Sequence, residues 1–309
     1  GQDLVFLLYL VGIAAAIFTG FLLKHTVLPG KSRVNIMELP LYEWPNLSHL
    51  FARVWQRTRS FLVGAGHTIV VVVCFLTFFN SLGTDGEFGH QDTGSSILSK
   101  TAQIVTPAFG PIGVQEQNWQ AGVGIITGIF AKEALVATFN NLYSSPDATE
   151  VGLPAWSEIW QQAVGTIGAN FSDISPEDPM GVDIGDVSSL DIAAREQEVE
   201  VATYLAMQQS FDGQMGAFCY LLFILLYTPC VAAMGAIKSE VGNRWAGFAA
   251  LWSFTLAYLV AALVFQSSQL LSAPVYASCV ILILLLIFMA IYLWLKRKGQ
   301  KILTIPVSV

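Results

Sequence analysis

Residues 276–295 read YASCVILILLLIFMAIYLWL, and this stretch decides the fold class. It contains no charged side chain, and at 1.5 Å per helical residue its length matches the roughly 30 Å hydrocarbon core of a bilayer. Lipid offers no partner to backbone N–H and C=O groups, so a spanning stretch must satisfy them internally as a helix. The sequence therefore predicts a membrane-spanning helix at 276–295.

Four further stretches are apolar and long enough to span in the same way. They are Leu4–Leu23, Phe61–Leu82, Phe218–Ile237 and Trp245–Gln266. The chain of 309 residues is 54% hydrophobic and only 12% charged, against about 25% charged residues in soluble domains. We expect an all-α polytopic membrane protein with about five clear transmembrane helices. This composition, with a net charge of −7, excludes nucleic-acid binding.

Lysine and arginine residues predict which side of the membrane each loop faces, because short cytoplasmic loops collect them. Segments 24–60, 238–244 and 296–309 are rich in basic residues and should be cytoplasmic. Loop 144–215 is strongly acidic and should be periplasmic, as should 83–96. The first residues lack the basic start of a signal peptide, and we expect the chain to be a piece of something longer.

Region 97–143 is not an ordinary lipid-facing helix. Its first part contains helix-breaking residues, and its second part carries adjacent charges in an apolar setting. The breaking residues are Pro107, Gly110, Pro111 and Gly113, and the charged ones are Lys132 and Glu133. The loop assignments agree only if this region crosses the membrane an even number of times. We therefore predict a discontinuous or re-entrant element at 97–143, of the kind from which transporters build substrate sites.

These assignments divide the chain into six segments. They are a transmembrane helix at 1–23, a cytoplasmic segment at 24–60, a span plus the broken element at 61–143, an acidic periplasmic loop at 144–215, an interrupted three-span region at 216–295, and a basic cytoplasmic tail at 296–309. Asn46 is a plausible N-cap, and apolar residues recur at helical spacing over 47–55. This pattern indicates an amphipathic helix on the inner membrane face, or one packed on other cytoplasmic protein.

No catalytic or cofactor-binding residues are expected, and the chain is not predicted to be an enzyme. It lacks the zinc-protease, nucleophile-elbow and dinucleotide motifs. All of its cysteines fall in apolar stretches, so neither a disulfide framework nor a CxxC metal knuckle is available. These cysteines are Cys74, Cys219, Cys230 and Cys279.

Glu133 is the best acidic candidate for an ion path. An acid and a base inside an apolar helix cost several kcal/mol unless they are paired, hydrated or bound to an ion. Adjacent helical positions point in different directions, so Glu133 and Lys132 are not expected to pair with each other. The alternative is that both make buried pairs with other helices, and Lys132 is the weaker candidate.

Pro229 marks a second interruption. It has no N–H to give to the carbonyl of Leu225, so the helix should kink or unwind beside Cys230. A freed carbonyl next to a thiol is a set of potential ion ligands, and we place both on the ion path. The alternative for Cys230 is that of any small packing residue in an apolar helix, where a thiol is inert.

Several ordered motifs resemble one known family. They are ELPLY at 38–42, RTRSF at 57–61, PAFGPIG at 107–113 followed by NWQ at 118–120, AKE at 131–133, and LLYTPC at 225–230 followed by GAI at 235–237. In this order and spacing they resemble the membrane domain of the bacterial ferrous-iron transporter FeoB, from near residue 1 to about residue 295. Pro107, Gly110, Pro111, Gly113 and Pro229 would shape its gates, and 229–230 resembles the second gate.

The resemblance implies a multi-pass protein of the bacterial inner membrane that transports Fe²⁺ into the cytoplasm. Fe²⁺ would be the transported ion rather than a tightly bound cofactor. GTP and Mg²⁺ would act only through an upstream G domain that this chain does not contain, as it does not contain the first gate. Small accessory proteins would meet the cytoplasmic side, and a homo-oligomer is allowed. The alternatives are another divalent-metal or nucleoside-type carrier, or a membrane regulatory or scaffold module that transports nothing.

Overall fold

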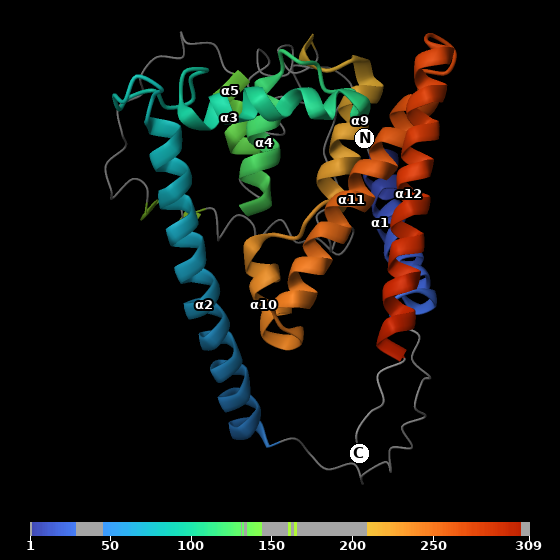
Figure 1. Ribbon diagram of the computed structural model, residues 1–309. Coiled ribbons are helices and arrows are strands. Elements are labelled where there is room, and N and C mark those ends of the chain that lie inside the picture. Colours follow the sequence, from blue (N-terminus) through green and yellow to red (C-terminus); the bar gives the residue numbers. More distant parts are fainter. Residues whose placement is uncertain are drawn as a thin grey trace.

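The computed structural model describes residues 2–28, 46–130, 132, 135–143, 160–161, 164–165 and 209–303. Helices dominate these ranges, and only isolated β-bridges occur there, so the all-α prediction is confirmed (Figure 1). The main helices are α1 (Gln2–His25), α2 (Leu47–Ser81), α3 (Ile97–Val105), the 3₁₀ helix η1 (Thr106–Ile112), α4 (Trp119–Phe130), α5 (Leu135–Tyr143), α9 (Gly213–Leu226), α10 (Val231–Val241), α11 (Asn243–Ser268) and α12 (Pro274–Leu303). Most of the predictions for 24–45 and for loop 144–215 fall outside the described residues.

Four helical segments are long and apolar enough to cross a membrane. They are Leu4–His25, Gly213–Val241, Asn243–Ser268 and Pro274–Gly299. Four of the five predicted spans lie within them, and Gly213–Val241 contains the interruption between α9 and α10. The fifth predicted span, 61–82, lies in α2 except for Leu82, which ends the helix, and Ile69–Ser81 is a shorter apolar stretch of α2. The chain is therefore a polytopic membrane protein.

Helix α2 differs from the prediction in its continuity. Asn46 caps its start as expected, because its side chain accepts a 3.1 Å hydrogen bond from the Ser48 N–H. The amphipathic stretch then continues into the following span as one 35-residue helix, and no proline separates the two parts. At 1.5 Å per residue such a helix is about 52 Å long, well beyond a 30 Å bilayer core. The predicted cytoplasmic tail at 296–309 also begins as a continuation of a span, because α12 extends to Leu303.

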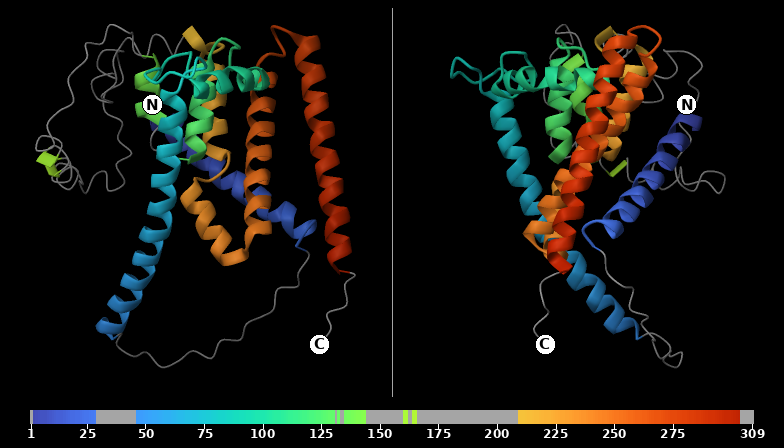
Figure 2. Two further views of the ribbon diagram at one scale, coloured as in Figure 1. Left: turned by 60° about the vertical axis from the view of Figure 1, so that its left-hand side comes forward. Right: turned by 45° about the vertical axis from the view of Figure 1, so that its right-hand side comes forward.

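The long helices place the expected loops at two opposite ends of the molecule. Figures 1 and 2 show the start of α2, the α10–α11 turn and the end of α12 toward one end, and loop 83–96 and the start of α9 at the other. A small cluster of Leu22, Val27, Trp252 and Leu295 joins the ends of α1 and α12 to α11. The start of α2, the α10–α11 turn and the end of α12 thus lie toward one end, and these are the segments that the sequence shows to be rich in lysine and arginine. Which end faces the cytoplasm stays a prediction.

The main core forms where α9 and α11 pack against each other and against η1. Phe223 of α9 lies at its centre, with its ring 5.4 Å from that of Phe109 and 5.5 Å from that of Phe254. Tyr258 and Gln266 of α11 donate hydrogen bonds to the η1 carbonyls of Ala108 and Pro111, at 2.8 and 3.0 Å. Irregular backbone is thus held by protein rather than exposed to lipid, as a membrane interior requires.

Region 97–143 is discontinuous, as predicted. It consists of α3, η1, α4, a single 3₁₀ residue at Lys132, and α5, and none of these pieces is long enough to span. Figure 1 shows α4 running from the level of α3 toward the middle of the molecule, with α5 beside it returning toward the same end. Both ends of the region therefore lie at the same end of the molecule, in keeping with the even number of membrane crossings that the loop charges predict.

Candidate functional site

The gate-shaping residues of the first interruption lie in η1 and the turn after it. Pro107 occupies the first turn of η1, where a proline costs no hydrogen bond, and Pro111 lies inside it. Gly113 ends η1 with a left-handed φ of 89°, which glycine adopts without strain. A Cβ on Gly113 would lie 2.6 Å from the Gly216 Cα, so this glycine also allows α9 to approach.

Helices α4 and α5 form an antiparallel hairpin built on close glycine contacts. A Cβ on Gly124 would lie 2.4 Å from the Phe139 ring, and one on Gly128 would lie 3.1 Å from Leu135. Gly124 and Gly128 thus meet Phe139 and Leu135 in reverse order, so the hairpin turns between Phe130 and Leu135. Lys132, the described residue between these two helices, lies at this turn, which we call the hairpin tip.

Asn118 fixes the open end of the hairpin. Its Oδ1 accepts hydrogen bonds from the Tyr143 hydroxyl, at 2.5 Å, and from the Ala121 N–H, at 3.1 Å. Its Nδ2 donates to the Ser210 carbonyl at 2.9 Å. Asn118 is 2% exposed. One buried amide thus ties together the start of α4, the end of α5 and the approach to α9.

The second interruption lies between α9 and α10, as Pro229 predicted. Helix α9 ends at Leu226, α10 begins at Val231, and Cys230 is the residue that precedes the first turn of α10. Thr228 donates a 3.2 Å hydrogen bond to the Ala250 carbonyl of α11 and so anchors the unwound segment. Figure 1 shows this segment directly beyond the inner end of α4.

The tip of the α4–α5 hairpin meets the second interruption at Lys132. Its Nζ donates a 3.1 Å hydrogen bond to the Ile224 carbonyl, in the last turn of α9, where carbonyls have no helical partner. The same Nζ lies 4.6 Å from the centroid of the Tyr227 ring. Cys230 lies three residues after Tyr227, at the end of the same unwound segment. The structure therefore brings Lys132 and Tyr227 together at the tip of the hairpin, with Cys230 further along the segment that contains Tyr227.

The structure does not add the other two predicted ion-path residues, Glu133 and Leu225, to this group. Glu133 lies outside the described residues. The Leu225 side chain is 43% exposed, and the carbonyl that Lys132 binds belongs to Ile224, one residue earlier. Among the described residues, no group of three or more His, Cys, Asp or Glu side chains is placed to hold a metal.

Sequence reasoning ranked Lys132 below Glu133 and did not single out Tyr227. Tyr227 is 2% exposed, and its hydroxyl has no hydrogen-bond partner. A Cβ on Gly128 would lie 2.5 Å from that hydroxyl, so the ring lies close against the α4 backbone. An aromatic residue two positions before Pro229 on an apolar helix looks like any other packing residue. Only the helix pairing reveals it as the partner of a cation.

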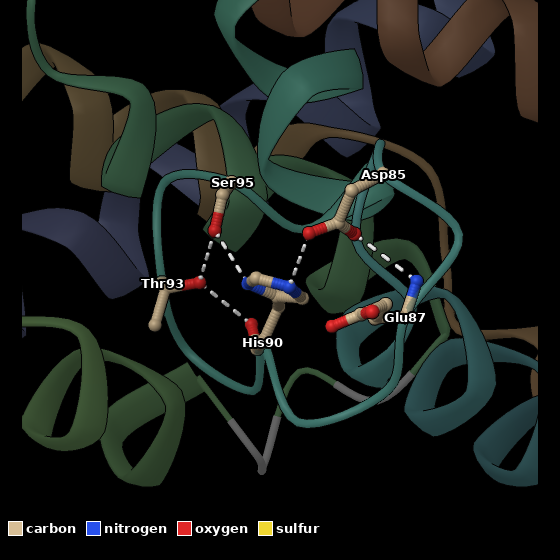
Figure 3. Close-up of polar contacts among 5 residues, drawn as sticks. All are labelled: Asp85, Glu87, His90, Thr93 and Ser95. Carbon is tan, nitrogen blue, oxygen red and sulfur yellow. Dashed lines mark hydrogen bonds and ion pairs between the residues drawn. The ribbon is translucent and has the colours of Figure 1, made fainter.

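A second polar cluster lies in the exposed loop 83–96, away from the interruptions. Figure 3 shows His90 between Asp85 and Ser95: its Nε2 is 3.0 Å from Asp85 Oδ2 and its Nδ1 is 2.9 Å from Ser95 Oγ. The Glu87 N–H donates to Asp85 and is the main cause that lowers the pKa of this carboxyl. Burial opposes the effect, and the charge of His90 adds to it. The cluster fixes the fold of the loop.

Two family models match the chain. One is described as "Ferrous iron transport protein B C terminus" and matches residues 5–57. The other is the Gate model, described as "Nucleoside recognition", which matches residues 62–244. The Gate match thus covers more than half of the chain, including both interruptions. No solved structure matched.

Curated relatives extend this match over nearly the whole chain. Proteins named "Fe(2+) transporter FeoB" from Salmonella typhimurium, Escherichia coli strain K12 and Shigella flexneri are each 33% identical to it over 302 residues, or 97% of the chain. The chain spans 38% of the length of these relatives. Ordered motifs, two family models and near-complete coverage agree, and the chain belongs to the FeoB family, of which it represents membrane-spanning, gate-containing sequence.

Proposed function

We propose that this chain forms part of the path by which Fe²⁺ crosses the bacterial inner membrane into the cytoplasm. The observation that carries the proposal is the meeting of two interrupted helical segments, where Lys132 at the hairpin tip contacts the Ile224 carbonyl and the Tyr227 ring beside the α9–α10 break. Transporters commonly build ion sites from such segments near the membrane midplane. The relatives named as Fe²⁺ transporters support the choice of ion.

Cys230, Glu133 and the Leu225 carbonyl are proposed to contact the ion in passage. Fe²⁺ accepts thiolate, carboxylate and carbonyl ligands, and a conduction site must bind weakly enough to release. Pro229, with Pro107, Gly110, Pro111 and Gly113, shapes the unwound backbone on either side. Because Fe²⁺ differs little from Zn²⁺ in raw affinity for such ligands, geometry has to supply the selectivity.

The energy source and partners are proposed to lie outside this chain. The chain covers 38% of its relatives, and we propose that an upstream G domain with GTP and Mg²⁺ drives or gates transport. Small accessory proteins would meet the cytoplasmic side, and a homo-oligomer is compatible with the proposal. The chain purified alone should not hydrolyse GTP, and GTP hydrolysis by it would contradict this division of labour.

The test is metal uptake by cells that express the full-length protein, with Fe²⁺ and Zn²⁺ compared. Cys230→Ser and Glu133→Gln should each lower Fe²⁺ uptake by about tenfold, because a lost contact to a charged group is worth about 1.5 to 3 kcal/mol. Cys279→Ser is the matched control, because Cys279 lies exposed on the unbroken helix α12. Wild-type uptake in both site variants, at equal expression, would return them to packing roles.

The description of the Gate model supplies the competing substrate class. Excess nucleoside should leave Fe²⁺ uptake unchanged. Nucleoside uptake that depends on Cys230, without Fe²⁺ uptake, would replace the proposal with a nucleoside-type carrier.

A further inference from the structure

The Lys132 ammonium occupies a position made for a cation. One of its partners is the Ile224 carbonyl, at the negative end of the α9 dipole, and the other is the electron-rich face of the Tyr227 ring. Both attract positive charge without regard to which cation carries it. Among the described residues, no carboxylate forms an ion pair with Lys132.

The surroundings hold this arrangement in place. The Tyr227 hydroxyl rests against Gly128, on the same helix that leads to the hairpin tip, which sets the ring beneath Lys132. Thr228 fixes the unwound segment to α11 through the Ala250 carbonyl. The ammonium is thus carried by the hairpin tip, while its binding groups belong to the end of α9 and the break that follows it. Lys132 closes the junction between them.

We propose that Lys132 is a tethered blocking cation: its ammonium fills the junction beside Cys230 and must leave the Ile224 carbonyl and the Tyr227 ring before a free cation crosses. This inference rests on the proposed function. A divalent ion at the same junction would meet a fixed positive charge at short range, and the two repel each other. The structure described here is then the closed state, and opening is departure of the Lys132 ammonium from the end of α9.

The first experiment measures access to Cys230 and needs no transport. In the full-length protein in liposomes, the Cys230 thiol is labelled with cationic 2-(trimethylammonium)ethyl methanethiosulfonate or with its neutral 2-hydroxyethyl analogue, and the Cys230 peptide is quantified by mass spectrometry. The readout is the ratio of the cationic to the neutral rate, because this ratio cancels any change in the thiolate fraction of Cys230 or in general accessibility.

Lys132→Gln should raise this ratio about tenfold, as expected for loss of one charged contact. Lys132→Met, which keeps most of the length of the side chain and removes its charge, should act alike and guards against a variant that folds poorly. Lys132→Arg retains the charge and should keep the wild-type ratio. Lys100→Gln is the matched control, since Lys100 is exposed on α3 and its Nζ donates a hydrogen bond to Gln103 of the same helix. An unchanged ratio in both Lys132→Gln and Lys132→Met would overturn the blocking role.

The second experiment separates this inference from the proposed function. Fe²⁺ flux into the same liposomes is measured with and without GTP. Wild-type flux with GTP, together with raised flux without GTP in Lys132→Gln, supports both ideas. A transporting wild type whose Lys132→Gln variant shows no added leak overturns the blocking role alone. Absence of Fe²⁺ flux in the wild type overturns the proposed function, and the labelling ratio then still decides whether Lys132 excludes cations.

Discussion

Helix α12 and the pair α9–α10 occupy similar lengths of apolar sequence but are used in opposite ways. The span in α12 is unbroken and only 11% buried, whereas the span over α9 and α10 is interrupted and 39% buried. An unbroken helix satisfies its own backbone and can face lipid, but an interrupted one frees carbonyls and N–H groups that only protein or water can satisfy. A break in the backbone is therefore one reason for burial, and helix packing is another, since the unbroken helix α11, which packs on α9, is also 39% buried over its span.

The hairpin of α4 and α5 extends the same contrast. Its helices are too short to span, and glycines let them approach each other and α9, whereas glycines in α1 touch nothing. A Cβ on Gly12 or Gly20 would meet no atom within 4 Å. The glycines of the hairpin are thus closely packed and those of α1 are not, so the following substitutions should affect the two regions unequally.

The largest effect is expected at Asn118, which ties the open end of the hairpin. Asn118→Ala should lower the free energy of unfolding by about 3 kcal/mol, because it leaves the Tyr143 hydroxyl and the Ala121 N–H buried without a partner. Thermal unfolding of the purified protein in detergent measures this. Asn80→Ala removes a half-buried amide that binds Asp92 and should cost less. Equal losses of stability in Asn118→Ala and Asn80→Ala would contradict the idea that the hairpin depends on close packing more than the exposed loop does.

A smaller loss is expected from a methyl group in the hairpin. Gly124→Ala places a Cβ 2.4 Å from the Phe139 ring and should cost about 2 kcal/mol through overpacking. Gly12→Ala in α1 has open space and should be neutral or slightly stabilising, because alanine favours a helix. The same unfolding measurement compares them. A stabilising Gly124→Ala would show that the hairpin is loosely packed.

The interruption itself can be tested by restoring a backbone donor. Pro229→Ala provides an N–H for the Leu225 carbonyl, so the helix should extend toward Cys230. One added hydrogen bond of about 0.5 to 1.5 kcal/mol should slow labelling of Cys230 by a neutral thiol reagent about threefold. Pro274→Ala, at the first residue of unbroken α12, should leave that rate unchanged. Faster labelling in Pro229→Ala would mean that proline is not what maintains the break.

The smallest effect is expected outside the interruptions, in loop 83–96. The pKa of Asp85 is lowered from its ordinary 3.8, chiefly by the Glu87 N–H. A depressed carboxyl pKa contributes stability above its unfolded value, and this contribution is lost as pH falls through the folded value. Thermal unfolding followed from pH 6 toward pH 3 should therefore be slightly less acid-sensitive in Asp85→Asn than in the wild type. Greater acid sensitivity in Asp85→Asn than in the wild type would show that Asp85 does not cause the loss of stability at low pH.

Local features of the sequence predicted much of this architecture. Hydropathy located the spans, Pro229 located the break between α9 and α10, and loop charges required region 97–143 to return to its own side. Each of these depends on one residue or one window, because the transfer energy of a segment and the missing donor of a proline are local properties.

Contacts between helices were not predictable in the same way. Nothing local specifies that Gly124 meets Phe139, or that Lys132 binds the Ile224 carbonyl rather than one near Leu225. The continuity of α2 was also missed, because an amphipathic stretch followed by an apolar one gives the same pattern whether or not the helix bends between them. Register and bending are decided by shape complementarity over several elements.

The uninterrupted length of α2 makes it a mechanical lever. It contacts α3, where the first broken region begins, and α10, which follows the second break. A rigid helix about 52 Å long that tilts by about 5° moves its far end by about 4 to 5 Å. Force applied near Leu47, at the end away from α3, is therefore delivered to the surroundings of both breaks at once, without passing through either of them.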